Sequence, residues 1–503
     1  MTTTLPQIHN GQAIPWKNVP ELSVTEFRSA VIERVHKDRR ISSLFGIPDG
    51  DQIILVAVLT NDHQATMSVC RTRVRDAYPA LTPEVPQAHW FEREIAEQWG
   101  VVPQGHPWLK PIRFHPSYTG RDVWGRDRTQ IEPCVTDYFR VEGQEVHEVA
   151  VGPVHAGIIE PGHFRFQCHG ENVFHLEIEL GYQHRGVERA LVGGPNPRTA
   201  HLMETLAGDT TIGHATAYAS VMEGLGGTTA PARAHSVRAI ALELERLANH
   251  TGDLGALAND VGFLPTASYC GRLRGDYLNM TAVLCGNRFG RNLVRPGGVR
   301  IDVTPQMIDD LLDRLRRTFN DTRNAVNLLW ETPSVMSRFD GTGCVPRQDA
   351  MRLGLVGPAG RASGVNLDVR SDLPWGSYQS HPLPSMTWNT GDVAARAYVR
   401  WFEIEKSVEF ITDEARALPT GSVLEKVAAP AGEHLAVALV EGWRGEICHT
   451  AVTDAQGRLR HYKIVDPSFH NWFGLAMALR NQQISDFPLC NKSFNLSYCG
   501  HDL

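Results

Sequence analysis

The sequence predicts an α+β protein of two domains, a small N-terminal α/β domain and a large, mostly helical domain with small β elements. Three observations predict it. The chain has 503 residues, 42% of them hydrophobic, which is more than one ordinary core accommodates. The first part contains a short continuous apolar run, and in the second part apolar residues recur at helical spacing. We place the domains at 1–120 and 148–503, with a linker at 121–147.

Two stretches define the first domain. The run IILVAVL at 53–59 lies between polar turns, as expected of a buried strand. The stretch WFEREIAEQWGVVPQGHPWLKPIRFHP at 90–116 predicts a charged helix that breaks at Gly100 and passes into a loop rich in glycine and proline. The polar, aperiodic sequence that follows, beginning with SYTGRDVWGRDRTQ at 117–130, predicts a mobile linker.

Long amphipathic helices dominate the second domain. Apolar residues keep to one helical face at 235–257 and again after Thr304. Thr304 and Pro305 are the expected N-cap and first residue of that later helix. Near the end, 435–454 and 457–467 are predicted to be strands joined by a DAQG turn, a hairpin that packs on the helices.

Charge and cysteine usage exclude several classes of protein. A net charge of -7, with basic residues scattered along the chain, argues against nucleic-acid binding. Nine cysteines without a C-x-x-C pair predict reduced thiols rather than a disulfide framework. We expect neither a signal peptide nor a membrane-spanning run, which needs about 18–20 apolar residues. No glycine-rich dinucleotide loop is evident, so a partner protein would handle any nicotinamide.

Several stretches resemble one superfamily, in the same order along nearly the whole chain. FEREIAEQWGVVPQGHPWLKPI resembles the signature of the C-type subunit of respiratory complex I. From residue 152 onward, the chain resembles the fused large subunit of group 4 membrane-bound [NiFe]-hydrogenases, which is similar to the D-type subunit of complex I. The motifs that carry this second resemblance are GPVHAGIIEPGHFRF, GYQHRGVERAL, GNRFGRNLVRPGGV, EGWRGEICH and DPSFHNW.

The resemblance implies that a nickel site has been lost. A [NiFe]-hydrogenase holds its metals with four cysteine thiolates, because soft sulfur ligands suit a redox-active nickel. Aligned on the family motifs, Ala207 and Thr210 stand at the two early cysteine positions, and Ser497 and Gly500 stand at the two late ones. Alanine and glycine offer no side-chain donor, and alcohols are poor ligands for soft metals. We therefore predict that nickel is absent and that the chain binds no metal.

The C-terminal stretch SFNLSYCGHDL at 493–503 then resembles a metal site that has decayed. One alternative is a zinc site made by Cys490, Cys499 and His501, since zinc accepts thiolate and imidazole ligands. The other is ordinary burial of the two thiols. The sequence favours burial.

Four residues are candidates for chemistry in the nickel-free cavity. In complex I the same pocket receives a quinone headgroup, which a tyrosine and a histidine hydrogen-bond, and the resemblance places Tyr218 on that tyrosine. His163 is the first choice for the histidine and His155 the second. Together a phenol and an imidazole could deliver the two protons that quinone reduction takes. Arg444 matches an arginine that overhangs the hydrogenase metal site, and its alternative role is a buried ion pair with Glu446 or Asp466.

The GYQHRGVERAL stretch is expected to face a partner. The resemblance places His184, Arg185 and Glu188 close to a small subunit that carries a [4Fe-4S] cluster, where Arg185 could hydrogen-bond across the interface. A solvated helix face is the alternative interpretation of the same charged residues. Because this chain has no cysteine cluster of its own, electrons would have to arrive from that partner.

Three functions remain open. The first is an electron-transfer subunit on the cytoplasmic face of the membrane, assembled with the cluster-bearing subunit, further soluble-arm subunits and an ion-pumping membrane arm, with a quinone or another small two-electron acceptor in the cavity. The second is a structural subunit with a vestigial cavity. The third is a hydrogenase with atypical ligands, which the missing thiolates disfavour.

Overall fold

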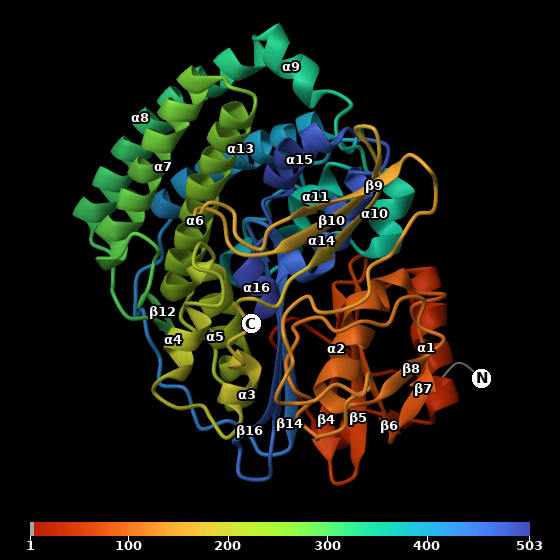
Figure 1. Cartoon of the computed structure of the whole chain (residues 1–503). Helices are drawn as coiled ribbons and strands as arrows, with labels where there is room; N and C mark the ends of the chain where they lie inside the picture. Colours follow the sequence, from red (N-terminus) through yellow and green to blue (C-terminus); the bar gives the residue numbers. More distant parts are fainter. Residues whose placement is uncertain (1–4) are drawn as a thin grey trace.

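The computed structural model describes residues 5–503 and shows a small N-terminal domain beside a larger, mainly helical part (Figure 1). A central sheet lies between them. One side of it contacts β4 (Arg40–Asp49) of the small domain, and the other contacts α5 (Thr211–Gly226) of the large one. The mixed α+β class predicted for the chain is confirmed.

A five-stranded sheet with two helices forms the small domain. Its strands follow the order β1-β6-β5-β4, and β3 pairs in parallel with β6. The predicted strand at 53–59 lies within β5, and the predicted break falls at Gly100, whose φ of 67° ends α2, so both predictions are confirmed. Besides β4, the elements are β1 (Gln7–Ile8), β3 (Glu21–Leu22), α1 (Val24–Lys37), β5 (Gln52–Asn61), β6 (Thr66–Val74), β7 (Ala77–Pro79), α2 (His89–Trp99) and β8 (Val102–Gln104).

The central sheet has four antiparallel strands in the order β16-β15-β14-β2. They are β2 (Ala13–Pro15), β14 (His434–Gly442), β15 (Gly445–Thr453) and β16 (Leu459–Val465). The stretch 435–454 was expected to form a single strand, and this is wrong. Gly442 and Gly445 face each other across a tight hairpin, where Gly445 takes a φ of 130° that only glycine adopts readily. β2 was not predicted, and it carries the N-terminal segment into the sheet of the large domain.

Helices make up most of the large domain. The predicted helix at 235–257 is confirmed within α6, and Thr304 caps α8 by accepting a hydrogen bond from the Met307 amide at 3.2 Å. Besides α5, they are α3 (Val187–Leu191), α4 (Thr199–Met203), α6 (Ala232–Asp260), α7 (Leu264–Cys285), α8 (Pro305–Trp330), α9 (Pro333–Phe339), α10 (Arg347–Leu353), α11 (Gly357–Arg361), α12 (Val369–Asp372), α13 (Val393–Arg416), α14 (Pro467–Ala478), α15 (Phe487–Phe494) and α16 (Tyr498–Asp502).

A third sheet and the segment before it connect the domains. The third sheet has the order β11-β10-β9, built from β9 (Val146–Val151), β10 (His163–His169) and β11 (Asn172–Glu179), and β12 (Val294–Arg295) pairs with β13 (Gly298–Val299) in a short ribbon. The structure assigns no helix or strand between β8 and β9. This segment is nevertheless tied down, because the Phe139 amide donates to Glu177 at 2.9 Å and Arg126 pairs with Asp122 at 2.8 Å. The boundaries at 120 and 148 stay a prediction.

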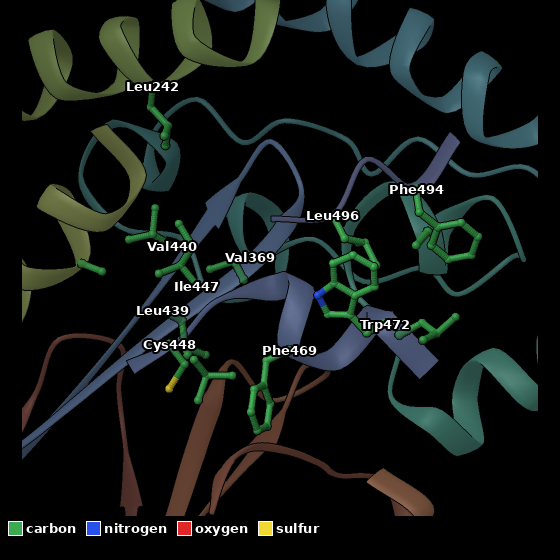
Figure 2. Close-up of a cluster of buried hydrophobic side chains, with 14 of the residues drawn as sticks. Leu242, Val369, Leu439, Val440, Ile447, Cys448, Phe469, Trp472, Phe494 and Leu496 are labelled. Carbon is green, nitrogen blue, oxygen red and sulfur yellow. The ribbon is translucent and has the colours of Figure 1, made fainter. Parts of the chain in front are cut away.

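The hydrophobic core joins the central sheet to the C-terminal tail (Figure 2). Figure 2 shows Leu439 and Cys448 of the β14–β15 hairpin near Phe469 of α14, and Leu496 of the tail beside Trp472. All of these side chains are buried. Packing of this kind fixes the last residues of the chain against the sheet, which positions the site described next.

Candidate functional site

The four positions predicted to match nickel ligands lie around the start of α5 and the C-terminal tail. Thr210 is the N-cap residue of α5, and Ser497 is the N-cap residue of α16, where its hydroxyl accepts a hydrogen bond from the Gly500 amide at 2.9 Å. A Cβ placed on Gly500 would lie 2.7 Å from Cγ of Asp466. A carboxylate therefore fills the space into which a side chain at position 500 would project.

Asp466 starts a buried hydrogen-bond chain that crosses the domain. Its carboxylate bonds His214 Nε2 at 3.0 Å, and His214 Nδ1 bonds His449 Nε2 at 3.1 Å. His449 Nδ1 in turn bonds the Tyr462 hydroxyl at 2.9 Å. All four side chains are buried, and we call them the buried chain. They come from β15, β16 and the residue before α14, which are consecutive in the sequence, and from α5, which lies more than 200 residues earlier.

Arg444 borders the same region, in an ion pair that the sequence did not predict. Its guanidinium nitrogens Nη1 and Nη2 each donate to the Asp209 carboxylate at 2.7 Å, and the Asp209 side chain is 32% exposed. Neither Glu446 nor Asp466 is its partner. Glu446 pairs with Arg40 at 2.5 Å, and Asp466 bonds His214 at 3.0 Å. Burial alone would raise the pKa of Asp209, but the adjacent guanidinium holds it below its usual value.

Tyr218 lies on α5, one turn after His214. It is 6% exposed, and its ring centroid is 6.4 Å from that of Tyr462, so the predicted catalytic tyrosine borders the end of the buried chain. Burial raises the pKa of Tyr218 to about 12, which keeps the phenol protonated and able to donate at neutral pH.

The two candidate histidines lie elsewhere, at the ends of the loop between β9 and β10. His155 Nε2 bonds the Gly162 carbonyl at 2.9 Å. His163 Nδ1 bonds the Gly152 carbonyl at 3.3 Å, and its Nε2 accepts from Arg165 at 3.2 Å. Burial lowers the pKa of His163. The structure does not bring either ring into contact with Tyr218, so their roles stay predictions.

The predicted interface residues hold this chain's own segments together. Arg185 donates to the carbonyls of Thr205 at 2.7 Å and Leu206 at 2.9 Å, and more weakly to that of Cys499 at 3.3 Å. It therefore ties the segment before α5 to the C-terminal tail. The side chain is exposed, so a further contact with a partner stays a prediction.

His184 and Glu188 face inward. His184 Nδ1 bonds the Asp502 carbonyl at 2.8 Å, and burial lowers its pKa to about 4. Glu188 is buried and accepts from Lys463 and from the Ile464 amide, both at 2.9 Å. Because its carboxylate is engaged inside the chain, Glu188 has little left to offer a partner.

The three residues of the zinc alternative lie in different surroundings. Cys490 packs against Gly343, Cys499 lies 3.4 Å from the Ser497 hydroxyl, and His501 stacks on Phe469 at 5.4 Å between ring centroids. Among residues 5–503 no three histidine, cysteine, aspartate or glutamate side chains gather in a way that could hold a metal ion.

An apolar cavity of about 480 Å³ lies between the small domain, β11 and α14. Aromatic rings and imidazoles form much of its wall, and the residues that shape it include Trp90, Trp108, Phe139, Phe469, His470 and Phe473. It is distinct from the surroundings of Tyr218. No single motif pointed to it, because its wall combines several segments that are distant in the chain.

Comparison with known proteins identifies the relatives of this chain. Residues 260–431 match the model of the respiratory-chain NADH dehydrogenase 49 kDa subunit, and residues 27–123 match that of the 30 kDa subunit. Formate hydrogenlyase subunit 5 of Escherichia coli is 30% identical over 439 residues, which cover 84% of this chain and 76% of that protein. The chain belongs to this family of fused complex I-type subunits. Its members are components of multi-subunit oxidoreductases.

Two further relatives show the breadth of the family. The fused C/D protein of the NADH-quinone oxidoreductase of Bacteroides thetaiotaomicron is 27% identical over 439 residues, 82% of each chain. The carbon monoxide-induced hydrogenase of Rhodospirillum rubrum is 30% identical over 350 residues, 69% of this chain and 97% of that protein. Within residues 5–503, no helix of this fused subunit has the length and apolarity needed to cross a membrane.

Proposed function

We propose that this fused subunit works in a membrane oxidoreductase without nickel, and that its cavity protonates a quinone or another small two-electron acceptor. One observation carries the proposal. The space beside Gly500, where the family alignment expects a ligand side chain, holds the Asp466 carboxylate, which already bonds His214 at 3.0 Å. Ala207, Thr210 and Ser497 supply no thiolate at the other positions. This donor set does not fit a soft metal.

The chemistry left to the chain is proton supply. Reduction of a quinone by two electrons takes up two protons, and a buried phenol such as Tyr218 is a suitable donor. His163 is the proposed second donor, with His155 as its alternative, provided that the loop carrying them approaches Tyr218 in the assembled complex. Arg444 is engaged by Asp209 through both prongs, so we assign it to holding the cavity wall rather than to binding substrate.

The partners follow from the same proposal. Electrons would arrive from a [4Fe-4S] cluster on a small subunit that docks near Arg185 and His184. Further soluble-arm subunits and an ion-pumping membrane arm would complete the complex, on the cytoplasmic face of the membrane. The NADH-quinone oxidoreductase C/D protein among the relatives supports a quinone as the acceptor class. The hydrogenases among them support the alternative of an atypical metal site.

Metal analysis of the purified native complex is the first test. We expect nickel far below one atom per chain, since the aligned positions offer no soft ligand. Nickel near one atom per chain, accompanied by hydrogen uptake, would refute the proposal and favour the atypical hydrogenase.

Substitution of the proposed donor is the second test. Tyr218→Phe keeps the volume of the ring and removes the hydroxyl, so the complex should assemble normally while electron transfer to quinone falls about a hundredfold. Tyr277→Phe, at a buried tyrosine of α7 whose hydroxyl bonds Thr322 at 3.2 Å, is the matched control. If Tyr218→Phe transfers electrons as fast as this control, the structural-subunit alternative takes precedence.

A further inference from the structure

We propose that the buried chain conducts protons from the Asp466 end to Tyr218. This inference rests on the proposed function, because it names the route by which the proposed proton donor is resupplied. It adds Tyr462, which lies outside the motifs, and His449, the last residue of EGWRGEICH, and it assigns a role to His214.

The placement of the four groups follows from regular secondary structure. His214 and Tyr218 are four residues apart on α5 and so share one face of that helix. His449 of β15 and Tyr462 of β16 lie diagonally on adjacent strands, since Ala451 is the residue paired with Tyr462. The helix face packs on the sheet, and the imidazoles meet between them.

Three groups of the buried chain, the two imidazoles and the Tyr462 hydroxyl, can both donate and accept, and the Asp466 carboxylate accepts. In one arrangement the Tyr462 hydroxyl donates to His449 Nδ1, His449 Nε2–H donates to His214 Nδ1, and His214 Nε2–H donates to the Asp466 carboxylate. No donor faces a donor, and no acceptor faces an acceptor. The chain is fully bonded with both imidazoles neutral.

A second arrangement holds one more proton. With His214 as an imidazolium, its Nδ1–H donates to His449 Nε2, and His449 Nδ1–H donates to the Tyr462 oxygen, whose own proton is then free. Release of that proton toward Tyr218, followed by the two shifts behind it, returns the chain to the neutral arrangement. The two arrangements differ by one proton, which leaves at Tyr462. The loaded arrangement returns when both imidazole rings turn over and His214 takes up a proton at the Asp466 end. No electron moves in these steps.

The surroundings favour conduction over permanent charge. Burial holds the pKa of His449 well below its usual value and that of Tyr462 well above it, so neither group stays charged between transfers. Asp466 stays ionised beside His214, and the Ser468 amide donates to it at 2.8 Å. The Tyr218 and Tyr462 rings are neighbours, 6.4 Å apart between centroids, so Tyr218 lies next to the group that releases the proton.

The test uses the native complex in a single turnover. The partner's clusters are reduced with dithionite, the excess is removed, and reoxidation by a short-chain quinone is followed by absorbance. His449→Gln retains an amide that bonds both neighbours without relaying a proton, and Tyr462→Phe removes the terminal hydroxyl. We expect both to slow reoxidation about a hundredfold. The reoxidation rates of both variants should also fall by a larger factor in D₂O than the rate of the parent, since proton delivery becomes the slowest step.

Matched controls separate conduction from structure. His461→Gln changes the neighbouring buried histidine of β16, which stacks on Phe45 on the opposite side of the sheet, at 5.1 Å between ring centroids. It should keep the parent rate and isotope effect. Reoxidation at the parent rate in His449→Gln and Tyr462→Phe would overturn the relay while leaving the proposed function intact. A parent complex that reduces no quinone would overturn both, and a loss of rate with an unchanged isotope effect would reduce the chain to a structural role.

Discussion

Two buried polar regions of the large domain differ in what their groups can do with a proton. The buried chain contains imidazoles and a phenol that exchange donor and acceptor roles. The other region, between α6, α13 and β14, is built from paired charges, and we call it the ion lattice. It comprises Glu243, Arg246, Arg361, Asp368, Arg370, Glu403 and Glu441.

The ion lattice is tightly paired. Arg361 bonds Glu403 and Glu441, both at 2.7 Å, and Arg370 bonds Asp368 at 2.7 Å. Burial alone would favour the neutral forms, but the opposite charges raise the pKa of Arg361 and hold that of Glu403 well below its usual value. Arginine does not lose its proton in proteins, so the guanidinium groups that link these carboxylates cannot relay one. The large domain therefore contains two kinds of buried polar region. The ion lattice provides rigidity, and the buried chain is suited to proton movement.

The largest expected effect comes from breaking the ion lattice. Glu403 accepts from Arg361 at 2.7 Å, His250 at 2.9 Å and Arg246 at 3.3 Å. Glu403→Gln leaves buried guanidinium groups without their counter-charge, which should cost about 3–5 kcal/mol of folding free energy. A lower thermal midpoint and lower recovery of assembled complex would show it. Glu409→Gln, at an exposed glutamate of the same helix, should match the parent within about 0.5 kcal/mol.

The next effect is a pH dependence carried by the lattice. Burial is the main cause that lowers the pKa of His250 to about 4, against an ordinary value of 6.5. The unfolded chain therefore binds more protons than the folded one between these values, and stability that is complete above pH 6.5 is lost as the pH falls toward 4. Urea unfolding across this range should show the loss in the parent and a shallower loss in His250→Gln. An equal dependence of the unfolding free energy on pH in the parent and in His250→Gln would contradict this prediction. His9→Gln, at an exposed histidine, serves as the control.

Local patterns predicted much of the fold. β5, α6 and the start of α8 follow from an apolar run, helical periodicity and a Thr-Pro cap, all of which are short-range signals. The pairing of β2 with β14 could not be predicted, because it joins a three-residue strand to a partner that is distant in the chain. Residues 435–454 were misjudged for a related reason, since a two-residue turn leaves little mark on an apolar stretch.

The candidate site likewise has one part that the sequence predicted and one part that it did not. Tyr218 and the positions predicted to match nickel ligands came from motifs. His449 ends the motif EGWRGEICH, but its role could not be predicted from it, and Tyr462 lies in a strand where any buried residue fits the alternation. Asp466 occupies the space beside Gly500 only because α14 and the tail pack together. A usable signal existed in HATAY, whose histidine and tyrosine share a helical face and so required polar neighbours on the sheet opposite.

The smallest expected effect is on the stability of the buried chain itself. Tyr462→Phe removes one hydroxyl, leaves His449 Nδ1 without its partner and keeps the volume of the ring, so the loss should be about 1–2 kcal/mol, well below that of Glu403→Gln. Urea midpoints of the two variants, measured side by side near neutral pH, give the comparison. If Tyr462→Phe destabilises as strongly as Glu403→Gln, the buried chain is a second rigid framework, and the contrast between the two regions fails. A small loss of stability, a large loss of reoxidation rate and a larger solvent isotope effect are the combination that a conducting chain produces.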